Sequence, residues 1–221
     1  RVEKQGADFV VYTEDREISC HSVVLATGAK NRPLGVEREE MMIGSGVSYC
    51  ATCDGAFFRG KKTAVVGGGN TALEDAEFLS NFCEKVYVIH RRDEFRGEQW
   101  LVNALIKKEN VEFVMDSVVT ELIGERSVEG VRVKNVKTDE VRELDVNGVF
   151  VAIGQMPDNK AFEDLVDLDG GGYIRGQEDC RTSCEGVFVA GDCRQKRIRQ
   201  ISTAISDGTI AAVEAIKYLD R

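Results

Sequence analysis

The stretch that decides the fold is residues 48–96, SYCATCDGAFFRGKKTAVVGGGNTALEDAEFLSNFCEKVYVIHRRDEFR. Residues 63–66 form a short β-branched run that ends at glycine, as a buried parallel strand does. Apolar residues then recur at helical spacing up to Phe82, and residues 85–89 form a second apolar run. The order predicts one βαβ unit of an α/β fold, with a glycine loop where its helix begins.

The glycine loop consists of Gly67, Gly68, Gly69, Asn70 and Thr71, and with the following alanine it fits the pattern G-x-G-x-x-A. Backbone amides at a helix N-terminus must approach a pyrophosphate closely, and a side chain would be in the way. We therefore expect these five residues to bind the pyrophosphate of a dinucleotide.

The residues after the second strand indicate which dinucleotide binds. A ribose 2′-hydroxyl calls for Asp or Glu there, whereas this chain has His90, Arg91 and Arg92, with Arg96 one turn later. Guanidinium groups match a 2′-phosphate, so NADP(H) is favoured over NAD(H). The alternative is a solvated basic cluster at the start of a helix.

The pair Cys50 and Cys53 has three interpretations: a redox dithiol, half of a zinc site, or two structural cysteines. Zinc would need two more ligands, and Cys180 and Cys184 are far along the chain and lack the short paired spacing of a zinc ribbon. Those two could instead close a small loop. Asp54 could supply a proton beside the sulfurs, or it could be a turn or cap residue. We favour the redox dithiol and expect no metal.

Composition excludes several classes of protein. The 221 residues are 43% apolar with a net charge of −9, so we expect a globular core and no nucleic-acid partner. There is no apolar run of 18 residues and no signal-like start, which argues against membrane insertion and favours the cytoplasm. Seven cysteines is an odd number, typical of a reducing compartment with one functional pair.

Further along, residues 117–146 predict a three-stranded antiparallel flap, and residues 149–153 predict another buried strand. Residues 186–192 predict a strand that delivers Asp192 at its carboxyl end, where open α/β sheets bind ligands. A helix is expected from residue 200 to 219, with Ile205, Ala212, Ile216 and Leu219 on one apolar face. Residue 1 is Arg and the first strands are entered in mid-domain, so we expect a fragment.

Five motifs together resemble the low-molecular-weight thioredoxin reductases: SYCATCDG, GGGNTALEDA, HRRDEFR, VFVAIG and GVFVAGDCRQKRIRQISTAISDG. The resemblance implies a homodimeric FAD enzyme in which NADPH reduces FAD, FAD reduces Cys50–Cys53, and the dithiol reduces thioredoxin or a thioredoxin-like protein. Asp54 would be the catalytic acid. The alternatives are a related flavoprotein acting on another disulfide partner or a small dithiol, and a non-catalytic NADP(H)-binding fragment.

The resemblance also implies an NADPH-binding domain inserted in a discontinuous FAD domain. Residues 33–153 would carry NADPH and the dithiol, and residues 1–32 and 154–221 would be two segments of the FAD domain. The remaining implied cofactor-binding residues are Ile153, Gly154, Gly191, Asp192, Arg199 and Gln200. Nothing before Phe9 can be the family's first glycine loop, so we expect the N-terminal part of the FAD domain to be missing and the fragment alone to be inactive.

Overall fold

The computed structural model describes residues 1–220, and the chain divides into two compact units. The inserted unit is Arg32–Gly154, and the flanking unit is Arg1–Asn31 together with Gln155–Arg221. These bounds lie one residue from those that the sequence analysis expects. The assignment of a cofactor to each unit stays a prediction.

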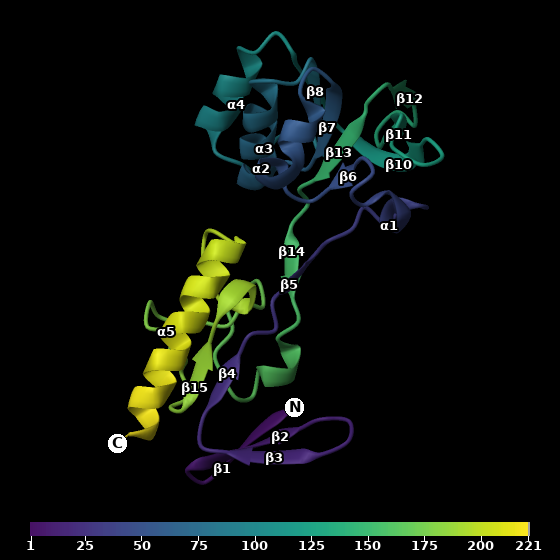
Figure 1. Ribbon diagram of the computed structural model, residues 1–221. Helices are drawn as coiled ribbons and strands as arrows, with labels where there is room; N and C mark the ends of the chain where they lie inside the picture. The colour runs from purple at the N-terminus through teal and green to yellow at the C-terminus, as the bar shows by residue number, and fades with distance from the viewer. Residues whose placement is uncertain (221) are drawn as a thin grey trace. The chain divides into compact units, whose positions relative to one another are not determined.

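The inserted unit is built on a five-stranded parallel sheet in the order β6-β13-β7-β8-β9 (Figure 1). A three-stranded antiparallel sheet, β10-β11-β12, is the predicted flap. The elements of this unit are α1 (Glu39–Met42), β6 (Val47–Ser48), α2 (Ala51–Asp54), η1 (Gly55–Phe58), β7 (Lys62–Val66), α3 (Asn70–Ser80), β8 (Lys85–Ile89), α4 (Gln99–Ile106), β9 (Val111–Val114), β10 (Ser117–Ile123), β11 (Gly130–Asn135), β12 (Val141–Leu144) and β13 (Gly148–Val151).

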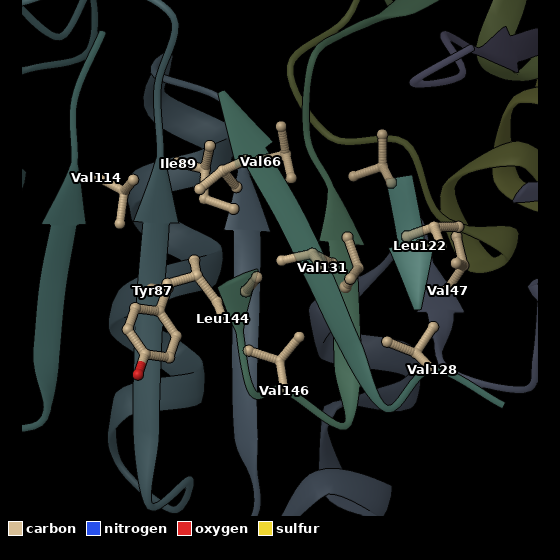
Figure 2. Packing of buried hydrophobic residues seen from close by; sticks show 14 of the residues in the cluster. Val47, Val66, Tyr87, Ile89, Val114, Leu122, Val128, Val131, Leu144 and Val146 are labelled. Carbon is tan, nitrogen blue, oxygen red and sulfur yellow. The ribbon is translucent and has the colours of Figure 1, made fainter. Parts of the chain in front are cut away.

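The parallel strands are apolar on both faces because each face is covered by a different layer. Val65 and Val88 pack with the apolar residues of α3 and α4, whereas the next residues, Val66 and Ile89, point the other way. That second face packs against the flap, and Figure 2 shows Leu122, Val131 and Leu144 of the flap beside it. The period of two along each strand thus produces two separate cores.

The order of the sheet decides where a ligand can bind. From β7 the chain passes through α3 to β8 and then to β9 on one side, whereas β13 and β6 lie on the other side of β7. The direction of the connections therefore changes between β7 and β13. In open α/β sheets a ligand binds at the carboxyl ends of the strands at such a point.

The flanking unit contains three small sheets and one long helix. They are the antiparallel sheet β1-β2-β3, the antiparallel pair β14-β5 and the parallel pair β15-β4. The elements are β1 (Val2–Gln5), β2 (Asp8–Tyr12), β3 (Glu17–Cys20), β4 (Val23–Leu25), β5 (Ala29–Asn31), β14 (Gln155–Pro157), η2 (Lys160–Phe162), β15 (Val187–Val189), η3 (Gly191–Cys193) and α5 (Ile201–Leu219).

The buried face of α5 differs from the apolar face expected from the sequence. Ile205 and Ile216 are 65% and 59% exposed, whereas Asp207, Ala211 and Ala215 are buried. Small residues allow the helix to approach the strand pair β15-β4, where Phe188 lies in the same cluster as the two alanines. In the described part of the chain, no helix has the length and apolar character needed to cross a membrane.

Candidate functional site

An open cavity of about 420 Å³ lies at the point where the sheet connections change direction. Its walls come from the ends of β7, β8 and β13, from the flap and from the start of the inserted unit. It is lined by Arg32, Leu34, Val66, Gly67, Gly68, Gly69, Thr71, Ile89, His90, Arg91, Arg96, Ser117, Val118, Val119, Ala152, Ile153 and Gly154. The sequence analysis predicts nine of these residues as cofactor contacts, and the fold brings all nine to one cavity.

Two glycines of the loop are required by close packing. Gly67 has φ +153°, and a Cβ there would lie 2.3 Å from the carbonyl oxygen of Ala152. A Cβ on Gly68 would lie 2.3 Å from the ring of His90. Gly69, the N-cap residue of α3, instead has open space beside it. The loop therefore packs tightly on the protein and leaves room on the side of the helix N-terminus.

Asn70 is not among the residues that line the cavity, and its contact with a cofactor stays a prediction. Its Oδ1 accepts a hydrogen bond of 2.8 Å from the backbone N–H of Glu98, which is the N-cap residue of α4. Backbone N–H groups of Arg96 and Gly97 donate to the carbonyl of Gly68 at 2.7 and 3.1 Å. These contacts hold residues 91–97 as a loop, and α4 begins at Gln99.

The three arginines after β8 are exposed and separate into two groups. Arg91 and Arg96 line the cavity, whereas Arg92 does not. None of the three forms an ion pair with a carboxylate of residues 1–220. Unpaired guanidinium groups at the edge of a cavity are suited to bind a phosphate group.

His90 lies inside this region as a buried side chain. Its ring is 4% exposed and stacks on Phe95, and its Nε2 donates to the carbonyl of Glu94 at 3.1 Å. Burial and the neighbouring arginines lower the pKa of His90 against the opposing effect of that hydrogen bond. The lowered pKa favours the neutral form of the ring, which packs against Gly68.

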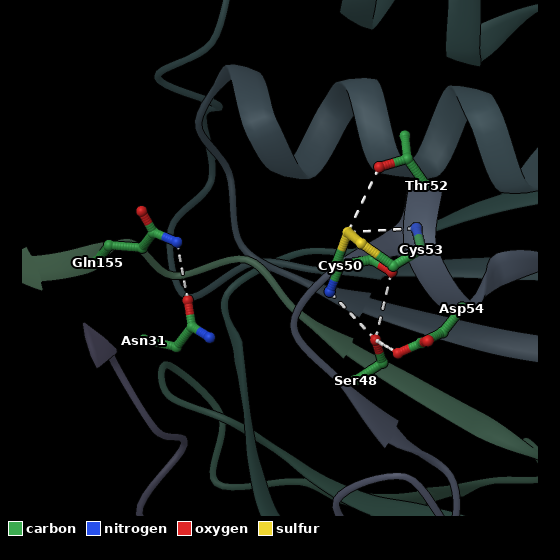
Figure 3. The surroundings of a disulfide bond; sticks show 7 residues. All are labelled: Asn31, Ser48, Cys50, Thr52, Cys53, Asp54 and Gln155. Atoms are coloured by element: carbon green, nitrogen blue, oxygen red, sulfur yellow. Dashed lines mark hydrogen bonds between the residues drawn. A yellow bond between two sulfur atoms is a disulfide. The ribbon is translucent and has the colours of Figure 1, made fainter. Parts of the chain in front are cut away.

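The redox pair forms a second group of residues in the same unit. Cys50 and Cys53 are joined by a disulfide with their Cα atoms 5.2 Å apart, and Figure 3 shows their surroundings. Cys50 is the N-cap residue of the short helix α2, and its Sγ accepts a hydrogen bond of 3.2 Å from the N–H of Cys53. The hydroxyl of Thr52 lies 3.4 Å from the same sulfur. Both contacts favour negative charge on Cys50 Sγ when the disulfide is open.

Asp54 is connected to this pair through Ser48, a contact that the sequence analysis did not predict. The buried hydroxyl of Ser48 donates to Asp54 Oδ2 at 2.7 Å and accepts from the N–H of Cys50 at 3.1 Å (Figure 3). Ser48 precedes the cysteines in the motif, but no spacing rule marks a serine in this role. It fixes the carboxylate relative to the backbone of Cys50.

The other five cysteines are free thiols: Cys20, Cys83, Cys180, Cys184 and Cys193. Cys180 and Cys184 therefore do not close a loop. Residues 1–220 contain no group of three or more His, Cys, Asp or Glu side chains that could hold a metal.

In the flanking unit, Gly191 and Asp192 follow β15 as the sequence predicts. Asp192 Oδ1 is buried and accepts no hydrogen bond from residues 1–220, and Lys196 Nζ lies 3.7 Å away. A buried carboxylate oxygen without a donor suits a ligand that carries a hydroxyl group. The sugar alcohol chain of FAD fits this requirement.

Asp207 organises the residues around Gly191 and Asp192, and the sequence analysis did not assign it a role. It accepts hydrogen bonds from the N–H of Gly191 at 3.1 Å, from both Nε and an Nη of Arg194, and from Lys196 at 3.0 Å. Burial alone would raise the pKa of Asp207, but the bonds from Arg194 and Lys196 outweigh it and lower the pKa. An ionised Asp207 therefore holds the turn that carries Asp192.

Arg199 and Gln200, also predicted near the flavin, have contacts within the unit. Arg199 Nε donates to the carbonyl of Asp192 at 3.2 Å, and its guanidinium lies 3.9 Å from the ring centre of Tyr173. Gln200 is the N-cap residue of α5 and forms a capping box with Thr203. Both residues thus position the start of α5.

Comparisons with known proteins agree with these features. Residues 1–208 match the family model of the pyridine nucleotide-disulphide oxidoreductases. A thioredoxin reductase of Coxiella burnetii is 42% identical over 221 residues, covering 96% of this chain and 69% of the relative. The crystal structure of a thioredoxin reductase from Streptococcus pyogenes has a TM-score of 0.92 and 43% identity, covering 100% of this chain and 72% of that one. A thioredoxin reductase from Giardia duodenalis has a TM-score of 0.91 and 33% identity, covering 100% and 73%.

These matches confirm the family resemblance and the α/β fold class predicted from the sequence. Thioredoxin reductases of this family use FAD and NADPH, the two cofactors that the motifs imply. The chain belongs to the pyridine nucleotide-disulphide oxidoreductases and, within them, to the thioredoxin reductases.

Proposed function

We propose that the Cys50–Cys53 pair of this chain, as part of the complete FAD enzyme, reduces the disulfide of thioredoxin with electrons that come from NADPH through FAD. One observation carries the proposal: a disulfide linked through Ser48 to a carboxylate lies in the same unit as a dinucleotide cavity. When bound, NADPH supplies a hydride and FAD passes the two electrons to the disulfide.

The inserted unit holds NADPH. The first N–H groups of α3 have no partner within the helix, and the open space beside Gly69 leaves room for a pyrophosphate. Arg91 and Arg96 bind the 2′-phosphate, and Arg92 adds charge at longer range. Ile153 and Gly154 form the wall beyond the loop, at the end of β13. His90 lines the cavity and packs under Gly68.

The flanking unit contributes residues to the FAD site. Asp192 accepts a hydrogen bond from a hydroxyl of the sugar alcohol chain, which satisfies its buried oxygen. Asp207 keeps that turn in place through Gly191 and Arg194. Arg199 and Gln200 set the start of α5, whose N-terminus favours a nearby negative charge.

The dithiol then reacts with the partner by thiol–disulfide exchange. Cys50, as the thiolate, attacks one sulfur of the thioredoxin disulfide, and the other sulfur leaves as a thiolate that takes up a proton. Cys53 then attacks Cys50 Sγ, which closes the Cys50–Cys53 disulfide and releases the second thioredoxin thiol. Asp54, held by Ser48, gives and takes protons at these sulfurs.

The family resemblance alone leads us to propose a homodimer. The five free thiols favour the cytoplasm, where the reducing environment keeps them stable. Asp54 and the cysteines belong to the NADPH unit, so one domain carries both the nucleotide and the dithiol.

The test uses the 221-residue chain itself. The chain is reduced with dithiothreitol, freed of excess reagent and mixed with oxidised thioredoxin, and alkylated thiols are counted by mass spectrometry. We expect one disulfide to be transferred from thioredoxin to each chain, with no complete transfer to Cys50→Ser or Cys53→Ser. Cys20→Ser, which alters another half-buried cysteine, should behave as the wild type. Transfer that survives in both active-site variants would refute the proposal.

A further inference from the structure

Glu39 is a buried carboxylate outside the site described above. It lies in α1, its residue is 3% exposed, and each of its oxygens accepts hydrogen bonds. Oε1 accepts from the N–H of Leu34 at 2.9 Å, and Oε2 accepts from the N–H of Gly35 at 2.9 Å. A third donor, the hydroxyl of Tyr49, lies 2.7 Å from Oε1. A buried carboxylate with three donors has one well-defined position.

The first donor, Leu34, belongs to a wall of the nucleotide cavity. Arg32 and Leu34 both line the cavity, although they are more than 30 residues before the glycine loop. The N–H of Arg32 donates to the carbonyl of Gly154, another lining residue, at 3.0 Å. Glu39 therefore fixes the part of the cavity wall that Leu34 forms.

The third donor belongs to the redox segment. Tyr49 directly precedes Cys50 and packs against the core beneath the flap. Burial raises the pKa of Tyr49, and the bond to Glu39 raises it further, so the phenol keeps its proton and remains a donor. One oxygen, Glu39 Oε1, thus connects Leu34 in the cavity wall with the residue beside the disulfide.

The disulfide supplies an element with two states. When it is closed, Cys50 is held to Cys53, and when it is open this restraint on Cys50 and on the adjacent Tyr49 is lost. A change at Tyr49 alters the hydrogen bond at Oε1, which Leu34 shares. We propose that Glu39 and Tyr49 are positioning residues that couple occupancy of the nucleotide cavity to the redox state of Cys50–Cys53. The coupling rests on the proposed function.

Coupling between two sites is reciprocal, so it is measurable as the ratio of two NADP⁺ dissociation constants, one for each redox state of the chain. The dissociation constant of NADP⁺ is measured by calorimetry for the chain with its disulfide closed and again after reduction with dithiothreitol. We expect the two constants to differ by about threefold to tenfold, at the low end of known couplings. NADP⁺ should shift the equilibrium with dithiothreitol by the same factor.

Tyr49→Phe removes only the hydroxyl, so the ratio should fall below about 1.5-fold while NADP⁺ still binds. Tyr87→Phe is the matched control, because Tyr87 is buried in the same core and should keep the wild-type ratio. Glu39→Gln keeps the volume of the side chain. Its ratio of the two dissociation constants should fall to the same low value as that of Tyr49→Phe.

The outcomes separate the two proposals. Equal affinities in both redox states of the wild type, or an unchanged ratio in Tyr49→Phe, would overturn the coupling and leave the proposed function standing. Absence of NADP⁺ binding in both states would contradict the proposed function and the coupling with it. A merely structural role for Tyr49 would lower stability without changing the ratio.

Discussion

Arg91 and Arg96 should decide the preference for NADPH over NADH, because both line the cavity and neither is neutralised by a carboxylate of residues 1–220. A sheltered hydrogen bond to a charged group contributes about 1.5–3 kcal/mol. Both arginines are exposed, so screening by water reduces each contribution to about 0.5–1 kcal/mol. Arg91→Ala with Arg96→Ala should therefore weaken NADPH binding by about fivefold to thirtyfold.

The assay is a calorimetric titration of the chain with NADPH and, separately, with NADH. NADH lacks the 2′-phosphate, so we expect its affinity to change by less than about twofold. Arg92→Ala should cost less than about threefold for NADPH, since Arg92 does not line the cavity. Arg126→Ala, in the exposed turn between β10 and β11, controls for the loss of net charge. Equal losses for the two nucleotides, or a loss as large in Arg126→Ala, would refute the reasoning.

Three further predictions concern stability, each measured by urea unfolding. Burial, and to a smaller extent repulsion from Glu74, raises the pKa of Asp75 from 3.8 to about 7. The stabilisation by the protonated carboxyl is therefore complete below pH 3.8 and is lost as the pH rises through 7. The free energy of unfolding of Asp75→Asn should exceed that of the wild type by on the order of 1–2 kcal/mol at pH 8 and should equal it at pH 4. The pKa of His90 is lowered from 6.5, so its contribution is present above pH 6.5 and is lost as pH falls below that value; His90→Asn should flatten the pH dependence between 7.5 and 5.5, and an unchanged profile would contradict the burial argument. Gly68→Ala puts a Cβ 2.3 Å from the ring of His90 and should cost about 1–3 kcal/mol and weaken NADP⁺ binding, whereas Gly69→Ala should be tolerated by the fold.

The sequence was most informative where one local pattern determines one structure. The β-branched runs and the glycine loop predicted β7, α3 and β8, because a buried parallel strand and a helix start each have a distinct signature. The flap was equally clear from its turns. Motif spacing also brought Gly67, Arg91 and Gly154 to one cavity, since all three follow strands of the same sheet.

Tertiary contacts account for the remainder. Ile205 and Ile216 form an apolar stripe, but Ala211 and Ala215 are the residues that pack on the strands, because close approach favours small side chains. Arg32 lines the cavity because of the route that the chain takes in three dimensions, and the periodicity of apolar residues does not predict that route. Ser48 acts through its hydrogen bond to Asp54, and Asp207 acts through the hydrogen bond that it accepts from Gly191. No spacing rule predicts these two contacts.

In the proposed function, Cys50 Sγ is the sulfur that exchanges with the partner protein. Cys53→Ser removes the thiol that would complete the exchange, so the mixed disulfide should accumulate when this variant meets oxidised thioredoxin. Intact mass and peptide mapping of the adduct identify the linked cysteine. We expect one thioredoxin per chain, bound to Cys50, and much slower adduct formation by Cys50→Ser through Cys53. An adduct through Cys20 or Cys184, or faster reaction of Cys53 than of Cys50, would contradict it.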